Sequence, residues 1–334
     1  MNAARGRDLT RNLFPIAALL VGGMWAGVYL SQHLAGAANA AQPVQPVVTT
    51  DADAAATSPA ETAPACDPDL AMAHVCMLAE RIGPRAAGSL EERQAAHYIG
   101  GYLLGLGYEI VNKGEVTLSG EHGMTRNVIA RRPAGDGAGL LLGAHYDSIA
   151  LNGPCPGAND NASGVAAMLE LARLCAEMDA PCPLYFVAFG GEEMIDRNRE
   201  HHHYGSRHFY THQPEPLVAM ISVDMIGVGE RLHLRYVEPA PEPLLQRLEQ
   251  AAAKSGIAVS RKPDPGWSDH EPFARGGMPA VWIHRLDDPA NHSAQDTADR
   301  VEPVYIQSVV SLLTEFMRGL TREDLDEMAA WSTG

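Results

Sequence analysis

Four short apolar runs dominate the hydrophobic pattern of the chain, at residues 139–144, 184–189, 218–223 and 280–283. Each is rich in aliphatic or aromatic residues and lacks helical periodicity, which is typical of strands buried on both faces. Polar residues with acidic or imidazole side chains follow each run. Because the carboxyl ends of parallel strands meet at one crevice, we expect these polar side chains to lie close together.

Segments with helical periodicity separate the strands. Apolar positions recur at helical spacing over residues 68–81, 90–104, 161–175 and 303–319. Ser89 and Glu92 form an S-x-x-E capping box at the start of the second of these helices. Residues 108–111 and 126–132 are predicted as further strands, the first of them at a sheet edge. Strands that alternate with helices predict an α/β sandwich.

The amino terminus has the layout of an export signal. Three arginines precede residues 13–30, a run of eighteen residues without a charge, and Ala38-Asn39-Ala40 follows as a cleavage site. The same run is long enough to span a bilayer, so an uncleaved membrane anchor is the alternative. In either case we expect the rest of the chain to be exported, to the periplasm or beyond the cell, and possible membrane anchoring through 13–30 stays open.

Composition divides the chain into four predicted parts. Residues 1–40 form the signal peptide or anchor, 41–65 an Ala/Pro/Thr-rich linker, 66–325 the catalytic domain and 326–334 a tail. The formal net charge of -16 argues against a nucleic-acid partner, since such surfaces need clustered Lys and Arg.

Five cysteines in an exported chain permit two disulfides. Cys66 with Cys76, and Cys175 with Cys182, are close enough in sequence to pair. Buried free thiols are the alternative.

A histidine and a carboxylate two residues apart follow the first apolar run, in G-A-H-Y-D-S (143–148). A neutral imidazole is a good zinc ligand, and Asp147 lies on the same side of an extended backbone as His145. We therefore predict His145 as a metal ligand and Asp147 as the carboxylate that orients its ring. Taken alone, a His-x-Asp pattern favours a structural role.

A polar turn at 157–164, G-A-N-D-N-A-S-G, leads directly into a predicted helix. The two carboxylate oxygens of Asp160 could bridge two cations, and the helix amino terminus favours their negative charge. The alternative is an ordinary helix cap, which Ser163 or Asn161 could provide without Asp160.

Adjacent carboxylates follow the second run, in G-G-E-E (190–193). At a buried strand end they repel one another unless cations neutralise them. Because adjacent side chains point in different directions, we assign Glu193 as a ligand and Glu192 as the general base. The alternative is a solvated charged turn.

Asp224 and His292 complete the predicted site. We expect His145 and Glu193 to bind one zinc ion and Asp224 and His292 the other, with Asp160 shared.

Two other polar clusters are assigned to loops. Consecutive side chains diverge, so residues 201–203, three histidines, are predicted as a solvated loop rather than a metal site. Ser268-Asp269-His270 is predicted as loop structure that lines the site, because adjacency in sequence is not the geometry of a catalytic triad.

Over about residues 68–320 the chain resembles the co-catalytic zinc exopeptidases of the aminopeptidase Y and bacterial leucyl aminopeptidase type. The motifs that carry the resemblance are I-G-P-R-A-A-G-S, R-N-V-I-A-R, H-Y-D-S, G-A-N-D-N-A-S-G-V-A, G-G-E-E, S-V-D-M-I-G, S-D-H-E-P-F and H-S-A-Q-D-T. The resemblance implies a three-layer α/β/α sandwich around a mixed, largely parallel sheet. It implies zinc ligands at His145, Asp160, Glu193, Asp224 and His292, with Glu192 as base and Asp147 behind the ligands.

The predicted function is that of an exported aminopeptidase that uses two zinc ions to remove amino-terminal residues from peptide substrates. Two departures from the family pattern keep alternatives open. The insertion at 194–203 and the Y-G-S-R-H after it resemble glutaminyl cyclases, which would use a single zinc. Asn291 stands where cyclases place Trp and some aminopeptidases an oxyanion-binding Tyr, so the oxyanion donor is unassigned. A catalytically silent, receptor-like ectodomain is the third alternative.

Overall fold

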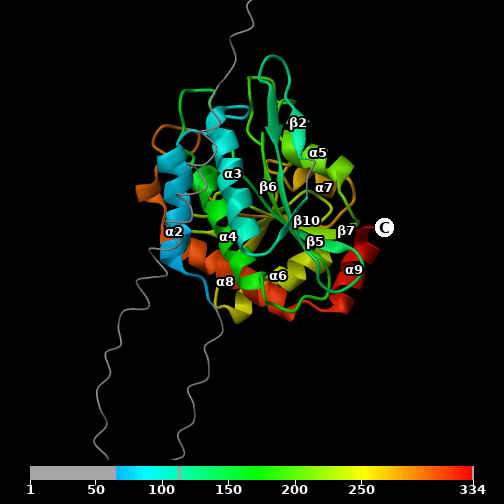
Figure 1. Cartoon of the computed structure of the whole chain (residues 1–334). Helices are drawn as coiled ribbons and strands as arrows, with labels where there is room; N and C mark the ends of the chain where they lie inside the picture. Colours follow the sequence, from blue (N-terminus) through cyan, green and yellow to red (C-terminus); the bar gives the residue numbers. More distant parts are fainter. Residues whose placement is uncertain (1–64, 112–113, 333–334) are drawn as a thin grey trace, which may run out of the picture. The chain divides into compact units, whose positions relative to one another are not determined.

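The computed structural model describes residues 65–111 and 114–332, all within the unit that spans residues 62–334 (Figure 1). The predicted signal or anchor and nearly all of the predicted linker lie outside the described residues. Within the described ranges, no helix combines the length and the apolar character needed to cross a membrane.

An eight-stranded mixed sheet forms the centre of this unit. Its order is β1 (Glu109–Val111), β4 (Val128–Arg132), β6 (Leu184–Phe189), β5 (Gly139–His145), β7 (Leu217–Val223), β10 (Ala280–Arg285), β8 (Leu232–Tyr236) and β9 (Val259–Pro263). The four central strands are parallel, whereas β1 and β4 are antiparallel to their neighbours and β8 is antiparallel to β10. Strands β2 (Glu115–Thr117) and β3 (Met124–Arg126) form a separate hairpin. The predicted apolar runs are thus confirmed as the central strands.

Helices cover both faces of the sheet, and Figure 1 shows α2, α3 and α4 on one side of it and α5 and α7 on the other. The larger core contains residues of α2 (Pro68–Cys76), α3 (Leu90–Gly105), α4 (Gly164–Cys175), α6 (Glu242–Lys254), α8 (Pro303–Gly319) and α9 (Arg322–Ser332). The smaller core contains residues of α5 (Tyr204–His212) and α7 (Glu271–Arg275). Short helical turns are η1 (Met77–Ile82), η2 (Ala158–Ser163) and η3 (Ala298–Arg300).

The central strands supply both cores because their side chains alternate between the two faces. In β5, Leu140 and Leu142 join the larger core, while Leu141 between them joins the smaller one. This period of two is what an extended backbone imposes, and it explains why these strands are continuously apolar. The predicted three-layer α/β/α sandwich is confirmed.

The predicted capping box at the start of α3 is present in a modified form. Ser89 Oγ accepts the backbone N–H of Glu92 at 3.0 Å, as predicted. The Glu92 carboxylate accepts the N–H of Gly88, one residue before the cap, at 2.7 Å, and it also accepts the hydroxyl of Thr125 on β3. Glu92 therefore helps to cap α3 and also connects this helix to the β2–β3 hairpin.

The boundary predicted at residue 325 falls inside a helix. Helix α9 runs from Arg322 to Ser332, and Leu325 and Met328 are buried in the larger core. Of the residues predicted as a tail, 326–332 therefore belong to this helix, and Met328 packs in the larger core. Charged residues separate the apolar residues of this short helix, so its apolar face was not predicted from the sequence.

The disulfide pairs predicted from sequence proximity are wrong, because all five cysteines are free. Cys66 precedes α2 and Cys76 ends it, so a helix of nine residues separates them. At about 1.5 Å of rise per residue this places the two residues on the order of 15 Å apart, far beyond disulfide reach. Cys175 and Cys182 are fully buried thiols, in line with the alternative.

Candidate metal centre

The predicted site residues meet at one edge of the sheet. Strands β6, β5, β7 and β10 are neighbours and run parallel, so their carboxyl ends lie side by side. His145 ends β5, Asp224 directly follows β7, and the two glutamates follow β6. Asp160 comes from η2, and His292 comes from the loop beyond β10.

Two groups of potential ligands form at this edge. His145, Asp160 and Asp224 make one group and Asp160, Glu193 and His292 the other, with the ligand atoms of each within 4.8 Å of one another. Asp160 Oδ1 lies 3.1 Å from His145 Nε2, and Asp160 Oδ2 lies 3.2 Å from His292 Nε2. Asp160 therefore offers one oxygen to each group, which is the shared position predicted for it.

The predicted division of the other ligands is wrong. His145 Nε2 lies 3.4 Å from Asp224 Oδ1, and His292 Nε2 lies 3.4 Å from Glu193 Oε2. His145 and Asp224 stand at the very ends of two adjacent strands, so they meet at the rim of the sheet. Glu193 lies four residues beyond β6 and reaches the loop that carries His292. The distance of each ligand from the end of its strand therefore decides which ligands share a group. The pattern of apolar and polar residues does not encode this distance.

The residues present fit a pair of metal cations. Glu193 Oε1 and Asp224 Oδ1 are buried and accept no hydrogen bond from the described residues. Burial, together with the charges of Asp160 and Glu192, raises the pKa of Glu193 well above its usual range. Cations at the two groups would neutralise this cluster and fill the free carboxylate positions. Imidazole and carboxylate ligands suit zinc.

Opposite charges shape the two groups further. Burial opposes ionisation of both His145 and Asp160. At His145 the negative charges of Glu192 and Asp224 outweigh burial and raise the pKa of the ring well above its usual value. Hydrogen bonds from His145 and His292 likewise overcome burial at Asp160 and lower the pKa of that carboxyl. Each imidazole and the carboxylate that it faces therefore favour one another's charged form.

Asp147 links the two strand ends that carry His145 and the glutamates. Its carboxylate accepts the backbone N–H of Glu192 at 3.1 Å and that of Glu193 at 3.2 Å. Its Oδ1 also lies 3.6 Å from His145 Nδ1, on the side of the ring that faces away from the ligands. The side chain is fully buried, so one carboxylate both faces the ring and fixes the G-G-E-E turn.

Two supporting residues were missed by the sequence analysis. Asp296 accepts the backbone N–H groups of Asn159 and Asp160, at 2.7 and 3.0 Å. Arg85 is completely buried and donates to five carbonyl oxygens, those of Leu78, Gly83, Tyr146, Pro156 and Gly157. Both residues lie within motifs quoted for the resemblance, but a motif does not show which backbone groups its side chains bind.

The prediction that residues 201–203 form a solvated loop is wrong for His203, whose side chain is 2% exposed. His203 Nε2 lies 3.0 Å from Glu192 Oε1, and Nδ1 lies 3.0 Å from Glu271 Oε2. Burial alone would lower the pKa of the ring, but Glu192 and Glu271 raise it to about 9. The backbone N–H of His203 donates to the carbonyl of Glu192, which turns the end of the insertion back to the site.

His202, His203 and Glu271 also bring ligand atoms within 4.8 Å of one another. The guanidinium of Arg207 already lies there, with Nη2 3.2 Å from both His202 Nε2 and Glu271 Oε2. A fixed cation occupies the place that a metal would take. This cluster therefore belongs to the protein's own ion pairs.

Ser268-Asp269-His270 lines the site as predicted and does not form a triad. Ser268 Oγ donates to Asp224 Oδ2 at 2.8 Å, whereas His270 Nε2 faces Asp264 at 3.3 Å. Asp269 is fully buried, and burial with the nearby charge of Glu192 raises its pKa to about 8. A second acidic group therefore stands close to the predicted base.

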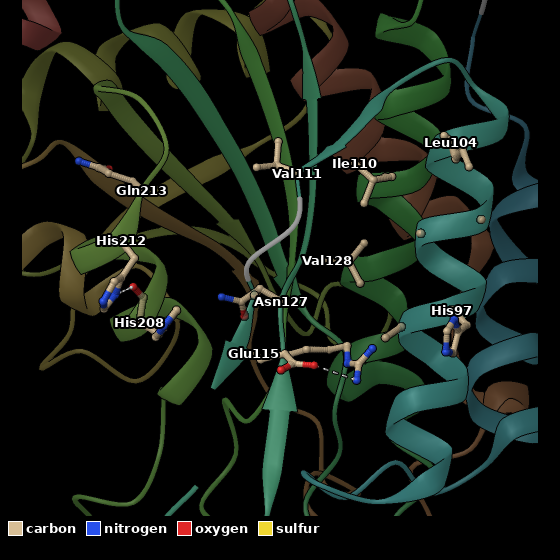
Figure 2. A pocket seen from close by; sticks show the side chains of 15 residues that line it. His97, Leu104, Ile110, Val111, Glu115, Asn127, Val128, His208, His212 and Gln213 are labelled. Carbon is tan, nitrogen blue, oxygen red and sulfur yellow. Dashed lines mark hydrogen bonds and ion pairs between the residues drawn. The ribbon is translucent and has the colours of Figure 1, made fainter. Parts of the chain in front are cut away.

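A pocket of about 1190 Å³ lies elsewhere, between α3, β1, β4 and α5. Figure 2 shows His97, His208, His212 and Glu115 around it. Glu115 forms an ion pair with Arg126, which also lines the pocket. None of the seven predicted site residues lines it. The described residues of its lining form no group of potential metal ligands like those at the strand ends.

The α/β/α sandwich thus carries two groups of potential metal ligands that share Asp160. Residues 127–317 match the model of peptidase family M28, and the chain belongs to this family. The predicted resemblance to the zinc exopeptidases is thereby confirmed at the level of the family.

Curated relatives are similar over part of their length. Aminopeptidase YwaD of Bacillus subtilis is 28% identical over 189 residues, which cover 52% of this chain and 39% of the relative. Leupeptin-inactivating enzyme 1 of Streptomyces exfoliatus is 29% identical over 297 residues, covering 86% of this chain and 61% of the relative. The chain spans about half the length, or less, of the first curated relatives it matches.

Solved structures show the same fold. A leucine aminopeptidase precursor from Bacteroides thetaiotaomicron has a TM-score of 0.69 at 22% identity, covering 78% of this chain and 99% of that one. A glutaminyl cyclase from Tannerella forsythia also has a TM-score of 0.69, at 21% identity, with 77% and 100% covered. At these identities the likeness concerns the fold alone.

Proposed function

We propose that this chain is a zinc-dependent aminopeptidase that removes amino-terminal residues from peptides. The observation that carries the proposal is the position of Asp160, which offers one oxygen to each of two ligand groups while Glu192 stands beside them. Glu192 Oε2 lies 4.0 Å from His145 Nε2, so this carboxylate borders the ligands without belonging to either group. Membership of a peptidase family and relatives named as aminopeptidases support the same proposal.

His145, Asp160, Glu193, Asp224 and His292 would hold two zinc ions. When bound, zinc supplies Lewis acidity, which polarises a peptide carbonyl and lowers the pKa of an attacking water. Glu192 takes the proton of that water and returns it to the departing amine nitrogen. Asp147 keeps the turn that carries Glu192 in place, and the carboxylates of the site favour a positively charged substrate amine.

Hydrolysis of aminoacyl 4-nitroanilides by the purified full chain tests the proposal. We expect turnover that a chelator abolishes and zinc restores, with about two zinc ions per chain. Asp160→Asn is the matched variant, because it keeps the shape of the side chain but weakens both ligand groups. If no zinc-dependent turnover occurs with a panel of amino-terminal side chains, the proposal is rejected.

Glutaminyl cyclisation is the second candidate, favoured by the ten-residue insertion between Glu193 and Tyr204. In that reaction Glu192 would move a proton from the substrate amine to the leaving ammonia, with one zinc. Mass spectrometry of Gln-peptides separates the candidates, since cyclisation releases ammonia and hydrolysis releases free Gln. The complete set of ligands argues against a silent receptor-like domain.

We further propose that the chain is exported, either with residues 13–30 removed as part of a signal peptide or with this run kept as an anchor. The support is the arginine-flanked apolar run followed by Ala38-Asn39-Ala40. Cell fractionation and sequencing of the mature amino terminus distinguish the two forms. Recovery of the intact chain from the cytoplasm would reject both.

A further inference from the structure

His203 makes one hydrogen-bonding contact with each of two carboxylates. Its Nε2 faces Glu192 Oε1 and its Nδ1 faces Glu271 Oε2, both at 3.0 Å. Carboxylates accept hydrogen bonds and an imidazole nitrogen donates only when protonated, so both ring nitrogens must carry hydrogen to satisfy both contacts. The ring is 2% exposed, so water does not compete for these bonds.

The contact with His203 decides which carboxylate oxygen of Glu192 remains available to act as a base. Oε1 is taken by His203, while Oε2 is turned toward His145 and the ligand groups. The backbone of Glu192 is fixed as well, since its N–H donates to Asp147 and its carbonyl accepts the N–H of His203. Backbone and side chain together leave Oε2 as the oxygen presented to the site.

Glu271 in turn fixes His203. Its Oε2 also accepts from Arg207 Nη2 at 3.2 Å, and its Oε1 accepts from Arg275 Nε at 2.8 Å. Two guanidinium groups therefore hold the carboxylate that holds the ring. The chain of contacts runs from α5 and α7 through His203 to Glu192, on the face of the sheet opposite the large core.

We infer that His203 is a positioning residue that donates a hydrogen bond to Glu192 Oε1 and thereby aims Glu192 Oε2 at the reacting water, with Glu271 setting the orientation of the ring. This inference rests on the proposed function, in which Glu192 is the base. It assigns a role to the last residue of the insertion that separates Glu193 from α5. His201, two residues earlier, instead contacts Asp196 at 2.7 Å.

A pair of substitutions separates hydrogen bonding from packing. The amide nitrogen of Gln reaches about as far as Nε2 of His, whereas that of Asn matches Nδ1. We expect His203→Asn to lower kcat about tenfold to hundredfold, the worth of a charge-assisted hydrogen bond, with KM and zinc content unchanged. His203→Gln should recover most of kcat. His201→Ala is the control and should match the wild type.

Packing alone predicts no difference between the two variants, because Asn and Gln fill the cavity of the ring comparably poorly. Thermal unfolding and zinc content, measured for each variant, show whether the fold and the metal site survive. Equal kcat for His203→Asn and the wild type would overturn the inference, as would equal losses in the Asn and Gln variants.

A second measurement does not depend on turnover. In zinc-loaded, ¹⁵N-histidine-labelled protein, long-range ¹H–¹⁵N spectra should show both nitrogens of His203 protonated, with the signals assigned by their loss in His203→Gln. Glu192→Gln should shift the Nε2 signal, and Glu271→Gln the Nδ1 signal. An unchanged Nε2 signal in Glu192→Gln would overturn the inference. Absence of turnover by the wild type would instead reject the proposed function, so the two failures are distinguishable.

Discussion

The hydroxyl of Ser268 donates a hydrogen bond to Oδ2 of Asp224 at 2.8 Å and leaves Oδ1 turned toward His145. Ser268 is fully buried, and its hydroxyl has Ser222 Oγ as a further neighbour at 3.3 Å. The bond therefore selects the oxygen of Asp224 that is available to a metal. Groups that orient a ligand in this way contribute to metal affinity without touching the metal.

Replacing this hydroxyl should weaken zinc binding. We expect Ser268→Ala to lower zinc affinity about tenfold to hundredfold, because Asp224 loses the bond that sets its rotation. Competition with a fluorescent chelator measures the change. Ser255→Ala, at a partly buried serine just after α6, is the control. Unaltered affinity in Ser268→Ala would show that packing alone orients Asp224.

Neutralising the predicted base should separate catalysis from metal binding. We expect Glu192→Gln to lower kcat by about 10² to 10⁴, because the amide cannot accept the proton of the water. Zinc content should stay at the wild-type value, since Glu192 belongs to neither ligand group. Stopped assays with aminoacyl anilides, alongside metal analysis, check both points. Retained activity would remove Glu192 from the role of base.

Removing zinc should destabilise the domain. The apo protein keeps several carboxylates within a few ångströms of one another at the strand ends, and bound cations stabilise the folded state by mass action. At a free zinc concentration of a hundred times Kd, the expected gain is about 2.7 kcal/mol. Thermal unfolding with a chelator and with added zinc measures the difference. In Glu193→Gln this difference should shrink, and an equal effect there would contradict zinc binding at the predicted ligands.

A buried glutamate outside the ligand groups should make stability depend on pH. Burial, with the nearby charge of Asp147, raises the pKa of Glu92 to about 8. The folded state therefore holds this proton more tightly than the unfolded state, whose pKa is about 4.3. The resulting stabilisation is complete at low pH and is lost as pH rises toward about 8.

Glu92→Gln should remove this dependence while it retains the capping box, which accepts Gln. Between about pH 5 and 8 the free energy of unfolding should fall less steeply than in the wild type, by up to about 1.4 kcal/mol per pH unit. Urea unfolding at several pH values gives the slopes. Glu91→Gln reports the effect of losing one carboxylate from the same turn. Identical slopes for Glu92→Gln and the wild type would contradict the prediction.

The buried arginine should not tolerate replacement by lysine. Arg85 donates to five carbonyl oxygens, two of them in and just after η1 and three in the loop between β5 and η2. An ammonium has neither enough donors nor the planar geometry to replace it. We expect Arg85→Lys to lower the free energy of unfolding by about 2–5 kcal/mol. Chemical denaturation measures the loss, and Arg81→Lys at an exposed position nearby is the control. A loss below that of ordinary surface variants would show that water replaces the guanidinium.

The sequence anticipated most of the central framework. Continuous apolar runs predicted β5, β6, β7 and β10, because a strand covered on both faces needs apolar side chains at every position. Helical periodicity predicted α3 and α8 with nearly their observed ends. No prediction covered β8, β9 or α6, the helix between them. Charged residues interrupt both strands, whereas the buried residues of α6 do recur at helical spacing.

At the site, too, the sequence predicted one part correctly and another part wrongly. Residue chemistry, together with position after a strand or before a helix, selected the seven side chains that the structure brings together at one edge of the sheet. The division into two groups was predicted wrongly, because sequence gives the order of residues along the chain and not how far each reaches beyond its strand.

By itself the sequence determined the sandwich, the sheet edge that carries the chemistry and the shared position of Asp160. Only the tertiary structure decided that His145 pairs with Asp224, that Glu193 pairs with His292, and that His203 contacts Glu192. Strand and helix patterns follow from which side chains must leave water, a property that each segment expresses locally. Contacts between polar residues depend on the paths of the loops that carry them. The sequence alone does not distinguish a buried histidine beside a glutamate from an exposed histidine.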